Sequence, residues 1–419
     1  MTVLIAGAGI AGLSMGLTLH QLGIPFRICE RVSEIRPLGV GINIQPNAVR
    51  ELYDLGLEER LDAIGVRTRQ YGFYTKTGLE IWAEPRGQFA GYSWPQYSIH
   101  RGQLQMMLLE ELQARAGADC VVTGAAVAGY EAGAQTASLI LADGSRVEGD
   151  LVIAADGIRS AIRHQMQPDE GEPIWNGAIM WRGTSLARPF LGGAAMILAG
   201  HDTQRFVAYP ISATDPETGL AEINWIAELR VDPGRAMSKG DWNKPANKAE
   251  FLPAFTDWTF DWIDCPGLIR ASGPVYEYPM VDRDPMAHWT DGRVTLMGDA
   301  AHATYPVGSN GASQAIIDAR KLGAALRAHG VTREALQAYE VEMRPRAEGI
   351  LRANRGAGPD AVMQMVEDRC GGVFNDIEDV IPRAELAAHA EKYKRLSGFS
   401  IEVLNAQPAI LGPMDPVMA

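Results

Sequence analysis

A glycine-rich loop near the amino terminus, Gly7 to Gly12, constrains the fold of this chain most. It follows an apolar segment, Val3 to Ala6, and precedes a stretch of helical periodicity, Leu13 to Leu22. A second apolar segment, Phe26 to Cys29, comes next. Strand, glycine turn, helix and strand in this order predict a βαβ unit, and hence a doubly wound α/β domain on a parallel sheet.

The glycine spacing in this loop is that of a dinucleotide-binding site. In GxGxxG the first glycine permits a tight turn, the second lets the backbone approach a pyrophosphate, and the third lets the helix pack closely. Glu30 ends the second strand, where it can accept hydrogen bonds from a ribose. A purely structural turn is the alternative, and the loop alone does not separate NAD from FAD. The predicted ADP-binding residues are Gly7, Gly9, Ile10, Ala11, Gly12, Glu30 and Arg31.

Size, charge and cysteine usage exclude several classes of protein. A chain of 419 residues exceeds what one core usually serves, so two or three domains are expected. A net charge of -13 disfavours a nucleic-acid partner, and no apolar run reaches the roughly 18 residues of a membrane span. The four cysteines lie far apart in the sequence, which predicts reduced thiols, no metal site and a cytoplasmic location.

Two later motifs also follow apolar strands. Asp156 opens an Asp-Gly-x-x-Ser-x-x-Arg segment after Leu151 to Ala155, and Gly298-Asp299 follows the strand 293–297. A carboxylate at Asp299 suits a polyol chain better than a phosphate. With the first glycine loop, these motifs suggest one long cofactor held at both ends.

With the three motifs in this order, residues 1 to 355 resemble the FAD-dependent aromatic hydroxylases, which are para-hydroxybenzoate hydroxylase-like class A flavoprotein monooxygenases. Within that family the chain is most similar to the phenazine hydroxylase branch (5-methylphenazine-1-carboxylate 1-monooxygenase-like). The segments that carry this closer resemblance are 36–46, 97–103, 180–183, 278–285 and 309–314.

The resemblance implies roles for residues outside the first loop. Asp299 would bind the ribityl hydroxyls of FAD, Arg101 the phosphate and ribityl region, and Asp156 would belong to a motif linked to FAD and NAD(P)H. Val127 would lie beside the adenine, and Gly41 and Ile42 near the isoalloxazine. The flavin-contacting loop would supply Pro306, Gly308, Gly311 and Ala312. The helix that follows would aim N–H groups at the flavin pyrimidine and stabilise the anionic reduced ring.

One departure from the family pattern lies in this loop. Many relatives carry Gly-Gln-Gly before the helix, whereas this chain has Ser309-Asn310-Gly311 with Gly308 preceding. The geometry of the loop is therefore less determined by the resemblance than the role of Asp299.

The resemblance also implies the reaction. NAD(P)H, as a transient co-substrate, would reduce FAD, and O2 would give a C4a-hydroperoxyflavin that hydroxylates a small aromatic, N-heteroaromatic or carboxylated molecule. The catalytic acid or base is unknown, because the flavin is the reactive group. Arg159 and Arg163 are interpreted either as steering the nicotinamide or as solvated charges, and His302 as structural rather than a base. Baeyer-Villiger oxygenation or epoxidation on the same fold is an alternative, and a non-catalytic flavin or aromatic-ligand binding protein is another.

The substrate is expected between the flavin and an antiparallel sheet. The candidate wall residues are Trp181, Arg182, Tyr209, Trp225 and Tyr305, with Pro306 beside the flavin; Arg182 can pair with a substrate carboxylate. The aromatic members fit an ordinary sheet core as well.

The expected organisation has four parts. Residues 1–176 form the first part of the FAD-binding domain, with a substrate-side excursion near 71–95. Residues 177–272 form the antiparallel-sheet substrate domain, 273–355 the second part of the FAD-binding domain, and 356–419 a helical tail. Helices are predicted over 101–117, 312–329 and 333–354, and a hairpin at Asp143-Gly144. The assembly is expected to be a monomer or homodimer.

Overall fold

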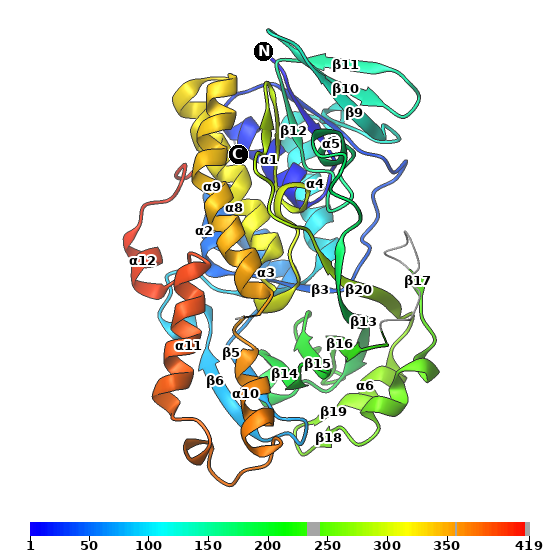
Figure 1. Cartoon of the computed structure of the whole chain (residues 1–419), viewed down its shortest axis with the longest axis vertical. Helices are drawn as coiled ribbons and strands as arrows, with labels where there is room; N and C mark the ends of the chain where they lie inside the picture. Colours follow the sequence, from blue (N-terminus) through cyan, green and yellow to red (C-terminus); the bar gives the residue numbers. More distant parts are fainter. Residues whose placement is uncertain (233–243, 357, 415–419) are drawn as a thin grey trace.

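The computed structural model describes residues 1–232, 244–356 and 358–414. Figure 1 shows two stacked parts, with a helix-covered sheet in the upper half and a larger sheet in the lower half. In the upper part, β1 (Val3–Ala6), α1 (Ile10–Gln21) and β2 (Phe26–Cys29) confirm the predicted βαβ unit.

The upper sheet has the strand order β21-β22-β12-β1-β2-β8. Its pairs are parallel except at one edge, where β21 runs antiparallel to β22. β1 lies in the middle and all four of its residues are buried, as the uninterrupted apolar run requires. The other strands are β8 (Val121–Val122), β12 (Leu151–Ala154), β21 (Thr290–Asp291) and β22 (Val294–Leu296).

The predicted helices of this part are confirmed. α4 (Arg101–Ala116) begins where His100 Nδ1 accepts from the backbone N–H of Gly102 at 3.1 Å, and ends at Gly117, whose φ is +88°. α8 (Gly311–His329) packs on α1 and on α9 (Arg333–Asn354). The remaining helices are α2 (Pro46–Asp54), α3 (Glu58–Ile64), α5 (Ala161–Met166) and α7 (Asp299–His302).

Two small sheets complete the upper part. The predicted hairpin at Asp143-Gly144 joins β10 (Ala137–Leu141) to β11 (Arg146–Gly149), with β9 (Val127–Ala132) beside β10. The second small sheet pairs β7 (Tyr97–His100) with β3 (Gly41–Ile44) and β4 (Gly65–Arg67). β3 matters for the site, because it lies where the two parts meet.

The lower sheet has the order β17-β20-β13-β16-β15-β14-β5-β6. The neighbouring strands within the predicted range 177–272 pair antiparallel, as expected, whereas β5, from outside that range, pairs with β14 in parallel. Its strands are β5 (Gln70–Tyr74), β6 (Glu80–Pro85), β13 (Ile174–Ala187), β14 (Ala195–His201), β15 (Gln204–Pro210), β16 (Ala221–Arg230), β17 (Lys244–Pro245) and β20 (Tyr276–Asp282). The excursion near 71–95 therefore joins this sheet, and β20 extends it beyond the expected boundary at 272.

The outer face of the lower sheet forms its own hydrophobic core. Trp181 stacks on Phe251 with ring centroids 4.8 Å apart, and Trp225 donates its indole N–H to Ser185 Oγ at 3.0 Å. α6 (Cys265–Ala271) and the short strands β18 (Thr259–Phe260) and β19 (Ile263–Asp264) cover this side of the molecule. The opposite face of the sheet is left to line a cavity.

The carboxy-terminal segment runs along both parts of the molecule. α10 (Ala361–Cys370) packs on β5, β6 and β14, and α11 (Arg383–Leu396) packs on α9. After α12 (Ile401–Ala406) the chain returns to the upper part, where the Met414 N–H donates to the Asp54 carbonyl at 2.7 Å (Figure 1). No helix in the described ranges is long and apolar enough to cross a membrane.

Candidate active site

A cavity of about 370 Å³ lies between the two parts of the molecule. One wall is backbone from the β1–α1 loop, from β3 and from the segment between Asp299 and Ala315. The floor is the inner face of the lower sheet. Of the predicted cofactor-binding residues, those that line this cavity are Gly9, Ile10, Ala11, Gly41, Ile42, Arg101, Asp299, Pro306, Gly308, Gly311 and Ala312.

The first glycine loop is tightly packed except at its middle glycine. A Cβ on Gly12 would lie 2.0 Å from the Gly7 carbonyl oxygen, and one on Gly7 would lie 2.6 Å from the Ala155 oxygen. A Cβ on Gly9 would meet nothing within 4 Å. The backbone at Gly9 is thus open to a ligand at the start of α1, while its neighbours hold the turn.

The remaining predicted ADP-binding residues lie around this loop rather than in the cavity. The Glu30 carboxylate accepts from the Ala8 N–H at 2.7 Å and from the Val32 N–H at 3.1 Å, which fixes it beside the glycines. Arg31 is exposed at the end of β2. Val127 begins β9 close to the same strand end, since the Ala125 N–H donates to the Glu30 carbonyl at 2.8 Å.

The motif at Asp156 contributes a half-satisfied carboxylate and a structural arginine. Asp156 Oδ2 accepts from the Ala161 N–H at 2.9 Å, whereas Oδ1 is buried without a partner in the described chain. Burial raises the pKa of this carboxyl. Arg163 is 1% exposed and donates to the carbonyls of Ala300 and Ala301 at 3.1 and 2.8 Å. It anchors the Asp299 segment from a buried position, so Arg163 is not a solvated charge.

The Asp299 segment is held by Asp318 on the side away from the cavity and is open on the side that faces it. Asp318 Oδ2 accepts from the Gly298 N–H at 2.8 Å and lies 2.6 Å from His302 Nε2. Although burial lowers the pKa of His302, the Asp318 carboxylate outweighs it and raises that pKa. His302 is thus held in a buried pair, in agreement with the structural role expected for it, and Asp299 alone presents an exposed carboxylate to the cavity.

The loop predicted to contact the flavin is held by a chain of hydrogen bonds that begins in the tail. Tyr393 Oη donates to Asn354 Oδ1 at 3.1 Å, and Asn354 Nδ2 donates to Thr304 Oγ1 at 3.1 Å and to the Tyr305 carbonyl at 3.3 Å. Gly308 turns with a φ of +71°, directly against Tyr393. The loop then delivers the first turn of α8 to the cavity.

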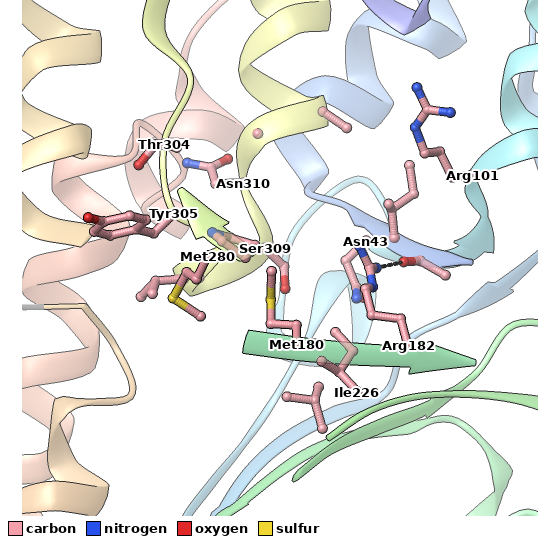
Figure 2. A pocket seen from close by; sticks show the side chains of 18 of the residues that line it. Asn43, Arg101, Met180, Arg182, Ile226, Met280, Thr304, Tyr305, Ser309 and Asn310 are labelled. Atoms are coloured by element: carbon pink, nitrogen blue, oxygen red, sulfur yellow. Dashed lines mark hydrogen bonds between the residues drawn. The ribbon is translucent and has the colours of Figure 1, made fainter. Parts of the chain in front are cut away.

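The floor presents alternate residues of its strands to the cavity. Figure 2 shows Met180, Arg182 and Ile226 on this floor, with Ser309 and Asn310 across the cavity from them. Arg182 Nη2 donates to the Gly41 carbonyl at 2.8 Å, while its buried Nε has no acceptor among the described residues (Figure 2).

Three of the five candidate substrate residues reach the cavity, namely Arg182, Tyr209 and Tyr305. Burial raises the pKa of both phenols to about 12, so they are neutral hydrogen-bonding groups. The structure does not bring Trp181 and Trp225 there, because both lie on the outer face of the sheet in its hydrophobic core. Strand alternation gives the reason: Trp181 neighbours Arg182, and Trp225 neighbours Ile226, so each points away from the cavity.

Sequence reasoning did not single out several lining residues. Those on the floor share the face of Arg182 or Tyr209 and could be found by counting every second residue of each strand. Asp360, from the tail, gives no such signal. The additional residues are Asn43, Tyr71, Met180, Met196, Leu198, Arg205, Val207, Ile226, Glu228, Met280 and Asp360.

The site fits FAD by its own geometry. The open backbone at Gly9 and the start of α1 suit a pyrophosphate, and the exposed Asp299 carboxylate suits a polyol. At Gly311 a Cβ would meet nothing within 4 Å, so the first turn of α8 leaves room for a flat ring. The buried Asn310 Nδ2 has no partner in the described part of the chain and can donate to such a ring.

Comparison with known proteins agrees with this geometry. The FAD binding domain family matches residues 1–235 and 277–354. Phenazine 1,6-dicarboxylic acid hydroxylase PhzS of Lysobacter antibioticus is 44% identical over 362 residues, which is 84% of this chain and 89% of that protein. Aurachin C monooxygenase/isomerase of Stigmatella aurantiaca is 32% identical over 343 residues, covering 81% and 84%.

Solved structures show the same fold. HpxO R204Q of Klebsiella pneumoniae, complexed with FAD, superposes with a TM-score of 0.72 at 24% identity, covering 99% of this chain and 100% of that one. A salicylate hydroxylase substrate complex gives a TM-score of 0.72 at 22% identity, covering 98% of each. With the family match, the cavity and its glycine and Asp299 walls, these relatives show that the chain belongs to the FAD binding domain family, as a class A FAD-dependent aromatic hydroxylase.

Proposed function

We propose that this chain hydroxylates a fused nitrogen-containing aromatic acid of the phenazine class, with NAD(P)H and O2 as co-substrates. The observation that carries the proposal is one continuous cavity that joins the predicted FAD wall to a floor on which Arg182 lies beside methionine and aliphatic side chains. The relative named for phenazine 1,6-dicarboxylic acid supports the ring class.

Different residues are proposed to hold the three parts of FAD. Gly9, Ile10 and Ala11 would hold the pyrophosphate, Asp299 the polyol chain, and Gly311 with Ala312 the ring. Bound FAD supplies electron transfer from NAD(P)H and activation of O2. The tasks of the protein are to bind and orient both partners and to exclude water.

The floor is suited to a flat, electron-rich ring. Met180, Met196 and Met280 line it together with aliphatic side chains. Thioethers are polarisable, adapt to ring shape and make favourable contacts with aromatic faces. These side chains also exclude water from the reacting atoms.

Arg182 is proposed to receive the substrate carboxylate. Its Nη2 is fixed on the Gly41 carbonyl, and its buried Nε remains available as a donor. Charge-assisted bonds from a preoriented guanidinium are strong and directional. The acid would thereby be held beside β3, at the flavin end of the floor.

A substitution at Arg182 tests this assignment. Arg182→Met should raise KM for an aromatic acid roughly 10- to 100-fold, because a hydrogen bond to a charged group contributes about 1.5–3 kcal/mol. The matching carboxamide should be affected much less. Arg188→Met, at an exposed arginine just beyond β13, is the control. Equal KM changes for acid and amide would contradict the role of Arg182.

The reaction itself is tested by stopped-flow measurement of flavin reduction with phenazine-1-carboxylate, followed by product mass under labelled O2. We expect substrate to accelerate reduction and one labelled oxygen to enter a ring hydroxyl. Conversion of a cyclic-ketone probe into a labelled lactone would favour the Baeyer-Villiger alternative, and a labelled epoxide would favour epoxidation. Flavin binding with no NAD(P)H oxidation for any aromatic acid would favour a binding protein.

The domain division, assembly and location are further parts of the proposal. We place the substrate domain on the lower sheet, including β5, β6 and β20, and the FAD-binding domain on the upper part. A monomer or homodimer in the cytoplasm remains the expected form. Light scattering after gel filtration would measure the assembly.

A further inference from the structure

A buried charged cluster lies on the cavity floor away from Arg182's contact with β3. It consists of Arg205 on β15, Glu228 on β16 and Asp360 just before α10, and we term it the far-end cluster. These residues are 7%, 7% and 6% exposed, and all three line the cavity. No step of the proposed reaction uses them.

Strand register places the far-end cluster at the opposite end of the floor from β3. Tyr209 and Asn224 form the row nearest β3, since the Gly41 N–H donates to Asn224 Oδ1 at 2.7 Å. Arg205 precedes Tyr209 by four residues on the same face, which corresponds to about 13 Å along the strand. Glu228 lies directly opposite Arg205 in the ladder. A substrate whose acid lies near Arg182 would therefore extend its other edge toward this cluster.

The arginine of the cluster has two of its donor groups engaged and one free. Arg205 Nη1 donates to Asp360 Oδ2 at 2.5 Å, and Nη2 donates to Asp202 Oδ1 at 3.3 Å. Its Nε is buried without a hydrogen-bond partner among the described residues. Asp360 of the tail thus engages Nη1 of Arg205, and the Nε–H can still donate to a ligand.

The charge of the cluster is already balanced without a ligand. Burial lowers the pKa of Arg205, but Asp360 and Glu228 outweigh it and raise that pKa, so the guanidinium stays charged. Burial raises the pKa of Glu228; Arg205 opposes this, while Asp360 and Asp202 add to it. One cation therefore faces three carboxyl groups, those of Asp360, Asp202 and Glu228.

A substrate carboxylate at this end would bring a further negative charge beside Asp360. Burying an extra charge without a counter-ion is costly, whereas a carbonyl or amide oxygen can accept the Nε–H without that cost. The far end thus differs from the Arg182 end, where the guanidinium contacts a neutral carbonyl.

We propose that the far-end cluster is a specificity subsite that takes an uncharged hydrogen-bond acceptor on the remote edge of the aromatic substrate and rejects a second carboxylate. The inference rests on the proposed function, because it assumes that the first acid group lies near Arg182. It predicts a monoacid for this chain, although one relative is named for a dicarboxylic acid.

The test compares two probes that differ only at the remote group, phenazine-1,6-dicarboxylate and its mono-amide. Dissociation constants are measured on the FAD-loaded enzyme from the change in flavin absorbance. The wild type should bind the mono-amide at least about 10-fold more tightly, because the second carboxylate would lie beside the like charge of Asp360. Asp360→Asn should bring the two constants close together, since it removes one negative charge and keeps the shape.

Two more variants distinguish an effect of the subsite from a general effect of removing a negative charge nearby. Asp202→Asn removes a carboxylate that contacts the same arginine from the outside, with its side chain 51% exposed, and it should leave the preference in place. Glu228→Gln should weaken the preference in the same direction as Asp360→Asn, which keeps the test available if one variant folds poorly.

The outcomes distinguish this inference from the proposed function. Equal binding of both probes by the wild type, or an unchanged preference in Asp360→Asn and Glu228→Gln, would overturn the subsite while leaving phenazine hydroxylation in place. If neither probe bound, nor phenazine-1-carboxylate stimulated NAD(P)H oxidation, the proposed function would fall and the subsite with it.

Discussion

Asp299→Ala should yield a protein that is purified largely without FAD. The cavity wall presents this carboxylate in an exposed position, while Gly298 and His302 beside it are fixed on Asp318. Each hydrogen bond from a ligand to a charged group contributes about 1.5–3 kcal/mol. Losing one such bond should raise the Kd for FAD roughly 10- to 100-fold, and losing two should raise it further.

The measurement is a titration of apoprotein with FAD, followed by flavin fluorescence. Asp299→Asn keeps one neutral acceptor and should fall between the wild type and Asp299→Ala. Asp257→Ala, at an exposed carboxylate outside the cavity, is the matched control. Unchanged FAD affinity in Asp299→Ala would refute the proposed role of this residue. It would also mean that the polyol chain of FAD binds elsewhere on the cavity wall.

The second large effect is expected at Gly308. Its φ is +71°, and a Cβ there would lie 2.1 Å from Tyr393 Oη. A left-handed conformation for alanine and the overpacking together should cost about 2–5 kcal/mol. Since Tyr393 also supports Asn354, which holds Thr304 and Tyr305, the change should displace the loop proposed to face the flavin.

Gly308→Ala should therefore lower the Tm of the apoprotein and reduce the hydroxylated product formed per NAD(P)H consumed. Gly311→Ala is the informative comparison, because an added methyl there meets no protein atom within 4 Å. It should leave apoprotein stability nearly unchanged and weaken FAD binding only. If both variants behaved alike in the absence of FAD, the contact between Gly308 and Tyr393 would not be what fixes the loop.

Features with a local signal were predictable from the sequence. The βαβ unit follows from apolar runs around a glycine loop, and α4, α8 and α9 follow from helical periodicity, with Gly117 ending α4. The lining residues of the lower strands were only partly predictable. Adjacent residues such as Trp181 and Arg182 cannot face the same side of a strand, so naming both as wall residues conflicted with the pleat.

Features that depend on distant parts of the chain gave no local signal. β20 lies within 273–355, the range expected to belong to the FAD-binding domain, yet it pairs with β13 in the lower sheet. Asp360 lies in an irregular turn, and its place in the cavity depends on how the tail packs against β14. The alternative of a solvated charge at Arg163 was wrong for the same reason, because its carbonyl partners lie at Ala300 and Ala301.

The path of the tail also determines when the site is completed during synthesis. The family match ends at residue 354, but Asp360 and Tyr393 follow it in the chain. Domains generally fold from the amino terminus while the ribosome is still elongating the chain. A nascent chain can therefore assemble the glycine loop and the Asp299 wall long before its substrate cavity has a far end. If the far-end cluster selects the substrate as proposed, selectivity depends on a segment that is synthesised after the FAD-binding part.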